Sequence, residues 1–179
     1  MTTVTYYDPP GGWAFGFPRV YKPRSGETID QTLIRDGFPK ANIVEGVLYC
    51  RFWQENENLT LADLTGQRLV YVATPYTHHP DGHAVAALEA AKACAALMRR
   101  GLCAISPIAH SHAVATAGDL DLVDGDFWQR QDAPLVEAAS ACVVITMPGW
   151  EESRGVKHEI AEFRSAGKPV VFVDPEELG

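Results

Sequence analysis

The residues best suited to chemistry lie in the segment 148–160, which reads PGWEESRGVKHEI. The apolar run Ala141–Met147 precedes this segment, and a helical pattern that ends at Gly167 follows it. A buried strand therefore leads into a loop, and the loop opens a helix. In an open α/β sheet, ligands bind outside the carboxyl ends of the strands. Ser153 and Gly155 lie where the backbone N–H groups of a helix N-terminus are unpaired, which favours an anion.

Glu159 is the first candidate for a reacting group. Taken alone, a glutamate in a helix is usually a solvated surface residue. Here Val156, Ile160 and Phe163 mark the apolar face of the predicted helix, and Glu159 lies three residues after Val156. A carboxylate that flanks the buried face can reach the cleft at the strand ends. There it could act as a nucleophile or stabilise positive charge.

A second carboxylate, Asp132, lies inside the predicted helix Asp126–Ala139, between Trp128 and Leu135. The alternative interpretation is a surface acid paired with a neighbouring arginine. Two carboxylates in one cleft allow one to act as an acid and the other as a nucleophile.

Two further polar loops follow predicted strands. Strand 69–73 leads to TPYTHH at residues 74–79, and strand 103–105 leads to SPIAHSH at residues 106–112. Because parallel strands end at the same edge of a sheet, we expect these loops and the loop before Glu159 to share a cleft. Tyr71 lies inside the first strand, and its pattern alone favours a core aromatic. The residues expected to contact a ligand are Thr74, Tyr76, His78, His110, His112, Trp150, Ser153, Arg154 and Gly155.

The histidines invite comparison with a metal site. Zinc needs three or four converging ligands, and the chain has no H-E-x-x-H motif and no cysteine pair to complete a set. We therefore expect no metal, and expect His110 and His112 to line the pocket. Trp150 lies in a polar loop, where its ring can stack on a base or a sugar.

The composition restricts the class of protein. A net charge of −8 over 179 residues argues against binding to long nucleic acids, which requires a basic surface, but permits a single nucleotide. No apolar run has the length of a membrane span, and the N-terminus lacks the features of a secretory signal. The four cysteines form no C-x-x-C pair. These features predict a cytoplasmic protein with reduced cysteines and no membrane partner.

The chain divides near residue 65. Residues 1–65 are rich in proline, glycine and aromatic residues and predict an irregular extension, with one short helix, 28–35, capped by Thr28 and Gln31. From residue 66 onward, short apolar strands alternate with helices, which predicts a parallel sheet covered on both faces. The expected strands are 69–73, 103–105, 142–146 and 170–173, and the expected helices are 83–100, 126–139 and 155–166.

The segment Ser153–Ile160, followed by Gly167-Lys168-Pro169-Val170, resembles the signature of the nucleoside 2-deoxyribosyltransferase superfamily, which includes 2'-deoxynucleoside 5'-monophosphate N-glycosidases. The spacing from the glutamate to Gly-Lys matches without a gap. The strand Val70–Ala73 resembles the family's opening strand with its tyrosine, and Asp132 falls at the family's aspartate. The resemblance covers about residues 68–174.

The resemblance implies a flavodoxin-like, doubly wound domain, commonly a homodimer or larger, that needs no cofactor and acts on a nucleoside or nucleotide. Glu159 would attack the anomeric carbon, Tyr71 would hold Glu159, and Asp132 would handle the proton of the departing base. Ser153 would bind a 5'-phosphate. Water as the acceptor gives hydrolysis, and a second base gives transfer.

The chain departs from the family pattern in two places. The phosphate-binding members have glycine and arginine in the loop after the first strand, where this chain has residues 74–79, so a phosphate would depend on Ser153–Gly155 or His78. Ala161 replaces the usual glycine two residues after the glutamate. Two other functions stay open: a nucleotide-sensing domain without turnover, and a metal-dependent hydrolase built on His78, His110 and His112.

Overall fold

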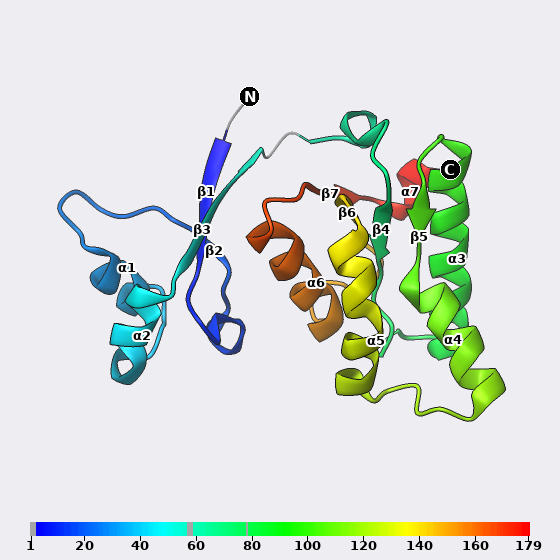
Figure 1. Ribbon diagram of the computed structural model, residues 1–179, viewed down its shortest axis with the longest axis horizontal. Helices are drawn as coiled ribbons and strands as arrows, with labels where there is room; N and C mark the ends of the chain where they lie inside the picture. The colour runs from blue at the N-terminus through cyan, green and yellow to red at the C-terminus, as the bar shows by residue number, and fades with distance from the viewer. Residues whose placement is uncertain (1–2, 57–58, 78) are drawn as a thin grey trace. The chain divides into compact units, whose positions relative to one another are not determined.

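The computed structural model describes residues 3–56, 59–77 and 79–179, which belong to two compact units (Figure 1). The first unit spans residues 1–58 and the second spans residues 59–179. The units therefore divide at Leu59 rather than at Gly66, because Leu61 and Leu64 pack against the core of the second unit.

The first unit contains a three-stranded antiparallel sheet, so the expectation of an irregular extension is wrong. The strand order is β2 (Arg19–Val20), β1 (Thr3–Asp8) and β3 (Arg51–Asn56). Because β1 pairs with a strand more than forty residues away, local sequence patterns do not reveal the pairing. The other elements are η1 (Gly12–Phe15), α1 (Ile29–Arg35), η2 (Lys40–Asn42) and α2 (Ile43–Leu48), and a small core forms from Tyr7, Phe17, Leu33 and Phe38.

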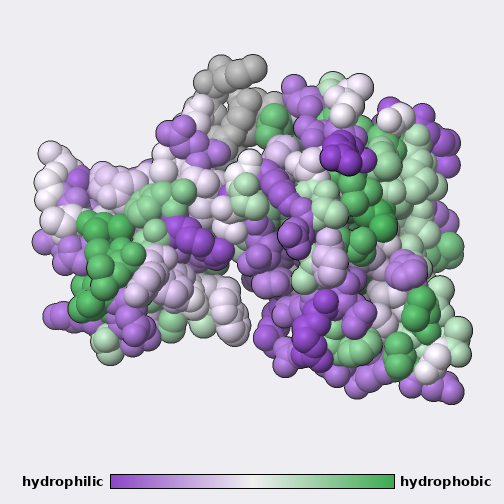
Figure 2. All heavy atoms as spheres, in the orientation of Figure 1, coloured by the Kyte–Doolittle hydropathy of each residue, from purple (hydrophilic) through white to green (hydrophobic). Residues whose placement is uncertain are grey.

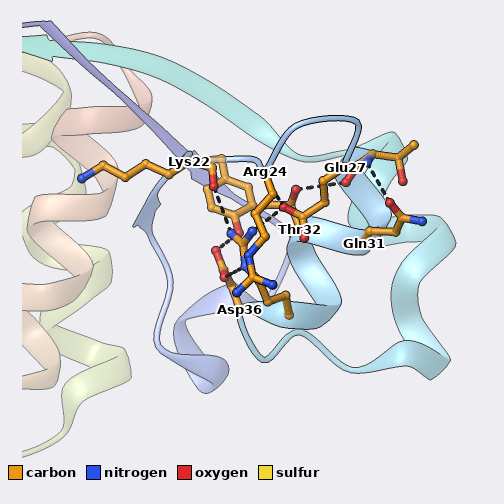
Figure 3. Close-up of polar contacts among 9 residues, drawn as sticks. Lys22, Arg24, Glu27, Gln31, Thr32 and Asp36 are labelled. Atoms are coloured by element: carbon orange, nitrogen blue, oxygen red, sulfur yellow. Dashed lines mark hydrogen bonds and ion pairs between the residues drawn. The ribbon is translucent and has the colours of Figure 1, made fainter.

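The start of α1 confirms the predicted capping box. Thr28 precedes the helix, and its backbone N–H donates to the side-chain oxygen of Gln31 at 3.0 Å (Figure 3). At the other end of α1, the buried Tyr7 hydroxyl donates to the Asp36 carboxylate at 2.6 Å. The hydrogen bond from Tyr7 ties the end of α1 to strand β1.

Helix α2 packs through its smallest residue. A Cβ atom on Gly46 would lie 2.4 Å from Cε1 of Phe38, so only glycine permits this close approach. The larger apolar side chains Val44, Leu48 and Tyr49 are instead about 70% exposed (69, 70 and 69%). Figure 2 shows hydrophobic residues gathered at the surface around α2. The first unit therefore presents an apolar surface patch.

The second unit is a four-stranded parallel sheet flanked by helices, as predicted, which is a Rossmann-like α/β arrangement. The strand order is β5 (Ala104–Ile105), β4 (Val70–Ala73), β6 (Ala141–Ile145) and β7 (Val170–Val173). The helical elements are η3 (Leu61–Leu64), α3 (His83–Arg99), α4 (Pro107–Gly118), α5 (Gly125–Ala138), α6 (Arg154–Ser165) and α7 (Pro175–Leu178).

Side chains of alternate residues of β4 pack on opposite faces of the sheet. Val70 and Val72 belong to a core that contains Leu97 of α3, whereas Tyr71 belongs to a core that contains Phe163 of α6. Figure 1 accordingly shows α3 on one side of the sheet and α5 and α6 on the other. Tyr71 thus faces the layer that carries Glu159.

The segment 106–112, expected to be a loop, is mostly helical. Helix α4 begins at Pro107, and the Ser106 hydroxyl caps it by accepting a hydrogen bond from the backbone N–H of Ala109 at 3.3 Å. Serine followed by proline is a typical helix start, because serine caps and proline at the first helical position needs no N–H partner. The Ser106-Pro107 pair is thus the sequence signal that marks this helix start.

The start of α5 also differs from its prediction. The predicted helix began at Asp126, but α5 begins at Gly125, and Asp124 caps it by accepting a hydrogen bond from the backbone N–H of Phe127 at 3.0 Å. Asp126 instead lies in the first turn, where its charge favours the helix N-terminus.

Cys50, Cys94, Cys103 and Cys142 are all free thiols. Two of them, Cys94 and Cys142, are buried. Within the residues that the structure describes, no helix is long and apolar enough to cross a membrane.

We expect Leu97→Ala to lower the free energy of unfolding by about 3 kcal/mol, because it leaves a cavity in the core beneath α3. Leu88→Ala, on the same helix but 54% exposed, is the matched control and should cost less than about 0.5 kcal/mol. Chemical denaturation with a constant m-value measures both. Equal costs would contradict this assignment of the core.

Candidate active site

A cavity of about 820 Å³ opens beside β4 in the second unit. Its wall comprises β4 and the loop that follows, together with residues of α4, α5 and α6. Along the chain, β5 is added on one side of β4, and β6 and β7 on the other. Ligands of open α/β sheets bind where the strand order reverses in this way. The topology therefore leads us to expect a ligand in this cavity.

A hydrogen bond joins β4 to α6 at the cavity wall. The hydroxyl of Tyr71, a fully buried residue, donates to Oε1 of Glu159 at 2.6 Å. The Tyr71 ring packs against Phe163, one turn after Glu159, with 5.5 Å between ring centroids. Both Tyr71 and Glu159 line the cavity. Tyr71 is thus a core aromatic whose one polar atom holds the carboxylate.

Burial raises the pKa of Glu159 to about 8. The hydrogen bond from Tyr71 acts in the opposite direction, and the nearby negative charge of Asp132 adds to the rise. Burial also raises the pKa of the Tyr71 hydroxyl far above its usual value, and the charge of Glu159 raises it further. Tyr71 therefore remains a neutral hydrogen-bond donor to Glu159.

Asp132 lies on the part of α5 that lines the cavity. Burial raises its pKa to about 6, although the charge of His110 lowers it. Because Asp132 and Glu159 interact, their protons belong to the pair. Near pH 7 the pair holds about one proton, which is the state that general acid catalysis beside a carboxylate nucleophile requires.

Lys168 fixes α5 beside α6. Its ammonium group donates to the carbonyl oxygens of Val136 at 2.9 Å and Glu137 at 2.7 Å, in the last turn of α5. The same ammonium lies 5.5 Å from the centroid of the Phe163 ring. Lys168 thus links the helix that carries Asp132 to the ring that packs on Tyr71. A cation at a helix C-terminus is favourable because it satisfies unpaired carbonyl groups.

The N-terminus of α6 borders the cavity. Ser153 caps the helix, accepting a hydrogen bond from the backbone N–H of Val156 at 3.3 Å. Ser153, Arg154 and Gly155 all line the cavity, as the sequence predicted. The Ser153 oxygen already serves the helix, so an anion here would depend on backbone N–H groups and on Arg154.

A second polar pair lies on the cavity wall. The hydroxyl of Tyr76 and Nδ1 of His112 are 2.7 Å apart, and both residues line the cavity. The Tyr76 ring stacks on the ring of His83, with 4.7 Å between centroids. Thr74 also lines the cavity; it is 4% exposed, and its hydroxyl has no hydrogen-bond partner within the part of the chain that the structure describes.

Comparison with known protein families finds a match within the second unit. Residues 68–174 match the model of a family described as a domain of unknown function, DUF1937. The chain belongs to the DUF1937 family. Within these bounds lie all four strands of the parallel sheet and every element that lines the cavity. No curated protein matches the chain.

The DUF1937 domain brings most of the predicted site residues together. Tyr71, Thr74, Tyr76, His112, Asp132, Ser153, Arg154, Gly155 and Glu159 all line the cavity. His110 does not line it; this exposed residue acts on Asp132 only through its charge. Trp150 also lies outside the lining and packs against Phe172, with ring centroids 5.5 Å apart. His78 is outside the described residues.

Several cavity residues were not predicted from the sequence. Trp128 and Gln129 line the cavity from α5, on the turn before Asp132, and Leu122 and Val123 line it from the preceding loop. The helical spacing of Trp128 and Asp132 was the available signal. Among the described residues, no group of three or more histidine, cysteine, aspartate or glutamate side chains is arranged to hold a metal ion.

The raised pKa of Glu159 has a consequence for stability. Between its usual value of 4.5 and about 8, the unfolded chain releases this proton while the folded chain retains it, so stability falls as pH rises through this range. Glu159→Gln removes the ionisable group and with it this loss of stability. We expect the variant to gain about 4 kcal/mol over the wild type between pH 5 and pH 9.

Thermal unfolding of both proteins at a series of pH values measures this gain. Glu151→Gln, in the exposed loop before α6, controls for the loss of one carboxylate. A difference between Glu159→Gln and the wild type that does not change with pH would show that Glu159 ionises normally in the folded protein.

Proposed function

We propose that this DUF1937 domain is an N-glycosidase that cleaves the N-glycosidic bond of a 2'-deoxynucleoside or its 5'-monophosphate. The observation that carries the proposal is the cavity-lining Glu159 held by Tyr71 at 2.6 Å, with the second acid Asp132 close enough to affect its pKa. Glycosidic bond cleavage typically uses two carboxyl groups, one as the acid and one as the nucleophile or base.

The strand order of the parallel sheet supports the proposal. The strand order β5-β4-β6-β7 is second, first, third and fourth along the chain, which is the beginning of the flavodoxin-like order 2-1-3-4-5. A flavodoxin-like domain is what the resemblance of Ser153–Ile160 to the nucleoside 2-deoxyribosyltransferase superfamily implies. The strand order is therefore the one that this resemblance implies.

In the first step, a carboxylate oxygen of Glu159 attacks the anomeric carbon of the deoxyribose. The bond between this carbon and the base nitrogen breaks, and its electron pair goes to the base. Asp132 gives its proton to the base, which leaves as a neutral molecule. The product is a deoxyribosyl ester of Glu159. Tyr71 keeps the attacking carboxylate in place through its hydrogen bond.

The single proton of the pair must lie on Asp132 when the reaction begins. In the free site the proton favours Glu159, whose pKa is the higher of the two. Positive charge that develops on the sugar stabilises the ionised form of Glu159. The transition state therefore favours the arrangement in which Glu159 is ionised and Asp132 carries the proton.

In the second step, water attacks the anomeric carbon of the ester and gives a proton to Asp132. The bond to Glu159 breaks, and the carboxylate is restored. A second base in place of water gives deoxyribosyl transfer. These steps need no metal ion and no redox cofactor, because the two carboxyl groups supply the nucleophile and the proton.

Substrate and assembly complete the proposal. A small-molecule nucleoside or nucleotide fits a cavity of about 820 Å³, and a 5'-phosphate would bind at the N-terminus of α6. The apolar patch around α2 favours the predicted homo-oligomer, because such surfaces are commonly covered by another chain. The cytoplasmic location stays a prediction.

Glu159→Gln should lower the rate of base release by at least about a thousandfold, because it removes the nucleophile. Asp132→Asn should lower it by about a hundredfold, since it removes the acid. The assay incubates the protein with 2'-deoxynucleosides and their 5'-monophosphates and detects free base by mass spectrometry. Glu151→Gln is the control, with wild-type activity expected.

The alternative is a nucleotide-binding domain without turnover, which the protonated state of Glu159 at neutral pH favours. Its signature is a nucleotide that binds the wild type and Glu159→Gln equally and is recovered intact after long incubation. That outcome, with no base released from any substrate, would refute the proposed reaction.

The pH dependence of base release should be bell-shaped with its maximum near pH 7. Below about 6 both carboxyl groups are protonated and no nucleophile exists; above about 8 both are ionised and no acid exists. Initial rates of base release between pH 4 and 10, expressed as kcat/KM, measure the two limits. Activity that rises steadily to pH 10 would exclude a carboxylic acid as the proton donor.

A further inference from the structure

The Tyr76–His112 pair has no role in the proposed bond cleavage. Tyr76 comes from the loop after β4, His112 from α4, and the His83 ring that stacks on Tyr76 comes from the first turn of α3. The Tyr76 oxygen and His112 Nδ1 are 2.7 Å apart, and both residues line the cavity that contains Glu159. Two polar side chains from separate elements are thus held together on the wall.

The pair can both donate and accept a hydrogen bond. If the Tyr76 hydroxyl donates to Nδ1 of a neutral His112, the tyrosine oxygen can still accept and Nε2–H can still donate. If Nδ1–H donates instead, the tyrosine O–H can still donate and Nε2 can still accept. In either tautomer one donor and one acceptor remain. A sugar hydroxyl, which donates and accepts, is the complementary group, whereas a phosphate only accepts.

The excess of acidic residues on the cavity wall also favours a sugar hydroxyl over a phosphate at this pair. Of the described residues, Arg154 and Lys168 are the arginine and lysine that line the cavity, and Lys168 already binds two carbonyl groups of α5. The carboxylates that line the cavity outnumber them: Asp124, Asp126, Asp132, Glu137, Glu159 and Glu162. An anion beside the Tyr76–His112 pair would meet net repulsion from these carboxylates.

Thr74 adds a further uncharged group to the same wall. It lies two residues before Tyr76 and is 4% exposed, and among the described residues its hydroxyl has no hydrogen-bond partner. A buried hydroxyl without a partner costs free energy unless a ligand or water satisfies it. The loop after β4 therefore offers the hydroxyl groups of Thr74 and Tyr76 to a ligand in the cavity.

We propose that the Tyr76–His112 pair binds a hydroxyl group of the substrate's deoxyribose and makes the domain select a nucleoside over its phosphate ester. The inference depends on the proposed function, because it concerns the same cavity. It assigns the loop after β4 and the start of α4 to sugar recognition. The bond cleavage belongs to Tyr71, Asp132 and Glu159.

The test combines variants with substrate analogues. Wild type, Tyr76→Phe and His112→Asn are assayed on a 2'-deoxynucleoside, on its 3'-deoxy and 5'-deoxy analogues, and on its 5'-monophosphate. His112→Asn retains a group beside Tyr76 but lacks the distal nitrogen. Tyr49→Phe, which removes a hydroxyl from an exposed tyrosine of the first unit, is the control. Base release gives kcat/KM, and calorimetric titration in the Glu159→Gln background gives Kd.

The wild type should lose about tenfold in kcat/KM on the analogue that lacks the contacted hydroxyl, as expected for one hydrogen bond. Tyr76→Phe and His112→Asn should lose about tenfold on the parent nucleoside and nothing further on that analogue. This loss should appear mainly in KM. The 5'-monophosphate should be the poorer substrate of the wild type.

A uniform loss across all four substrates would overturn the inference, because it would mean that the pair is only structural. Preference of the wild type for the 5'-monophosphate would overturn it as well. If the wild type releases no base, the proposed function fails and the titration decides the inference. Equal Kd values for the parent and both analogues would then refute it.

Discussion

The hydrogen bond between Tyr71 and Glu159 is the interaction on which the site depends. It joins the central strand of the parallel sheet to helix α6 at 2.6 Å and holds a carboxyl group against a buried layer. Burial makes ionisation of Glu159 costly, while the tyrosine hydroxyl and any positive charge in the cavity favour it. A positive charge in the cavity would therefore be stabilised best beside Glu159. The proposed cleavage of a glycosidic bond would develop charge at such a position.

The parallel sheet could be predicted because its strands are short apolar runs separated by helix-forming segments that end at glycine. Residues 83–100 and 155–166 show this clearly, and α3 and α6 follow within a residue at each end. The first unit could not be predicted in the same way. Its sheet depends on pairing between residues 3–8 and 51–56, and such contacts leave no local pattern. Helix α4 was missed although Ser106-Pro107 is a regular helix start.

The position of Glu159 at the cavity was expected from its helical spacing after Val156, and its contact with Tyr71 was expected from the family resemblance. What the sequence could not provide was side-chain direction. Trp150 lies in the loop after β6, as predicted, yet its ring packs against Phe172 and does not line the cavity. Conversely, the link from Lys168 to the last turn of α5 brings together residues more than thirty positions apart. The pairing of Tyr76 with His112 depends on α4 being a helix, which sets where His112 projects.

The central claim is that Glu159 itself attacks the sugar. The most direct measurement is the mass of the protein after brief reaction with 2'-deoxynucleosides and acid quenching, followed by peptide mapping. The account predicts a protein heavier by one deoxyribosyl group, with the added mass on the peptide that contains Glu159 and absent from Glu159→Gln. Base release without any modified protein, undiminished in Glu159→Gln, would contradict it.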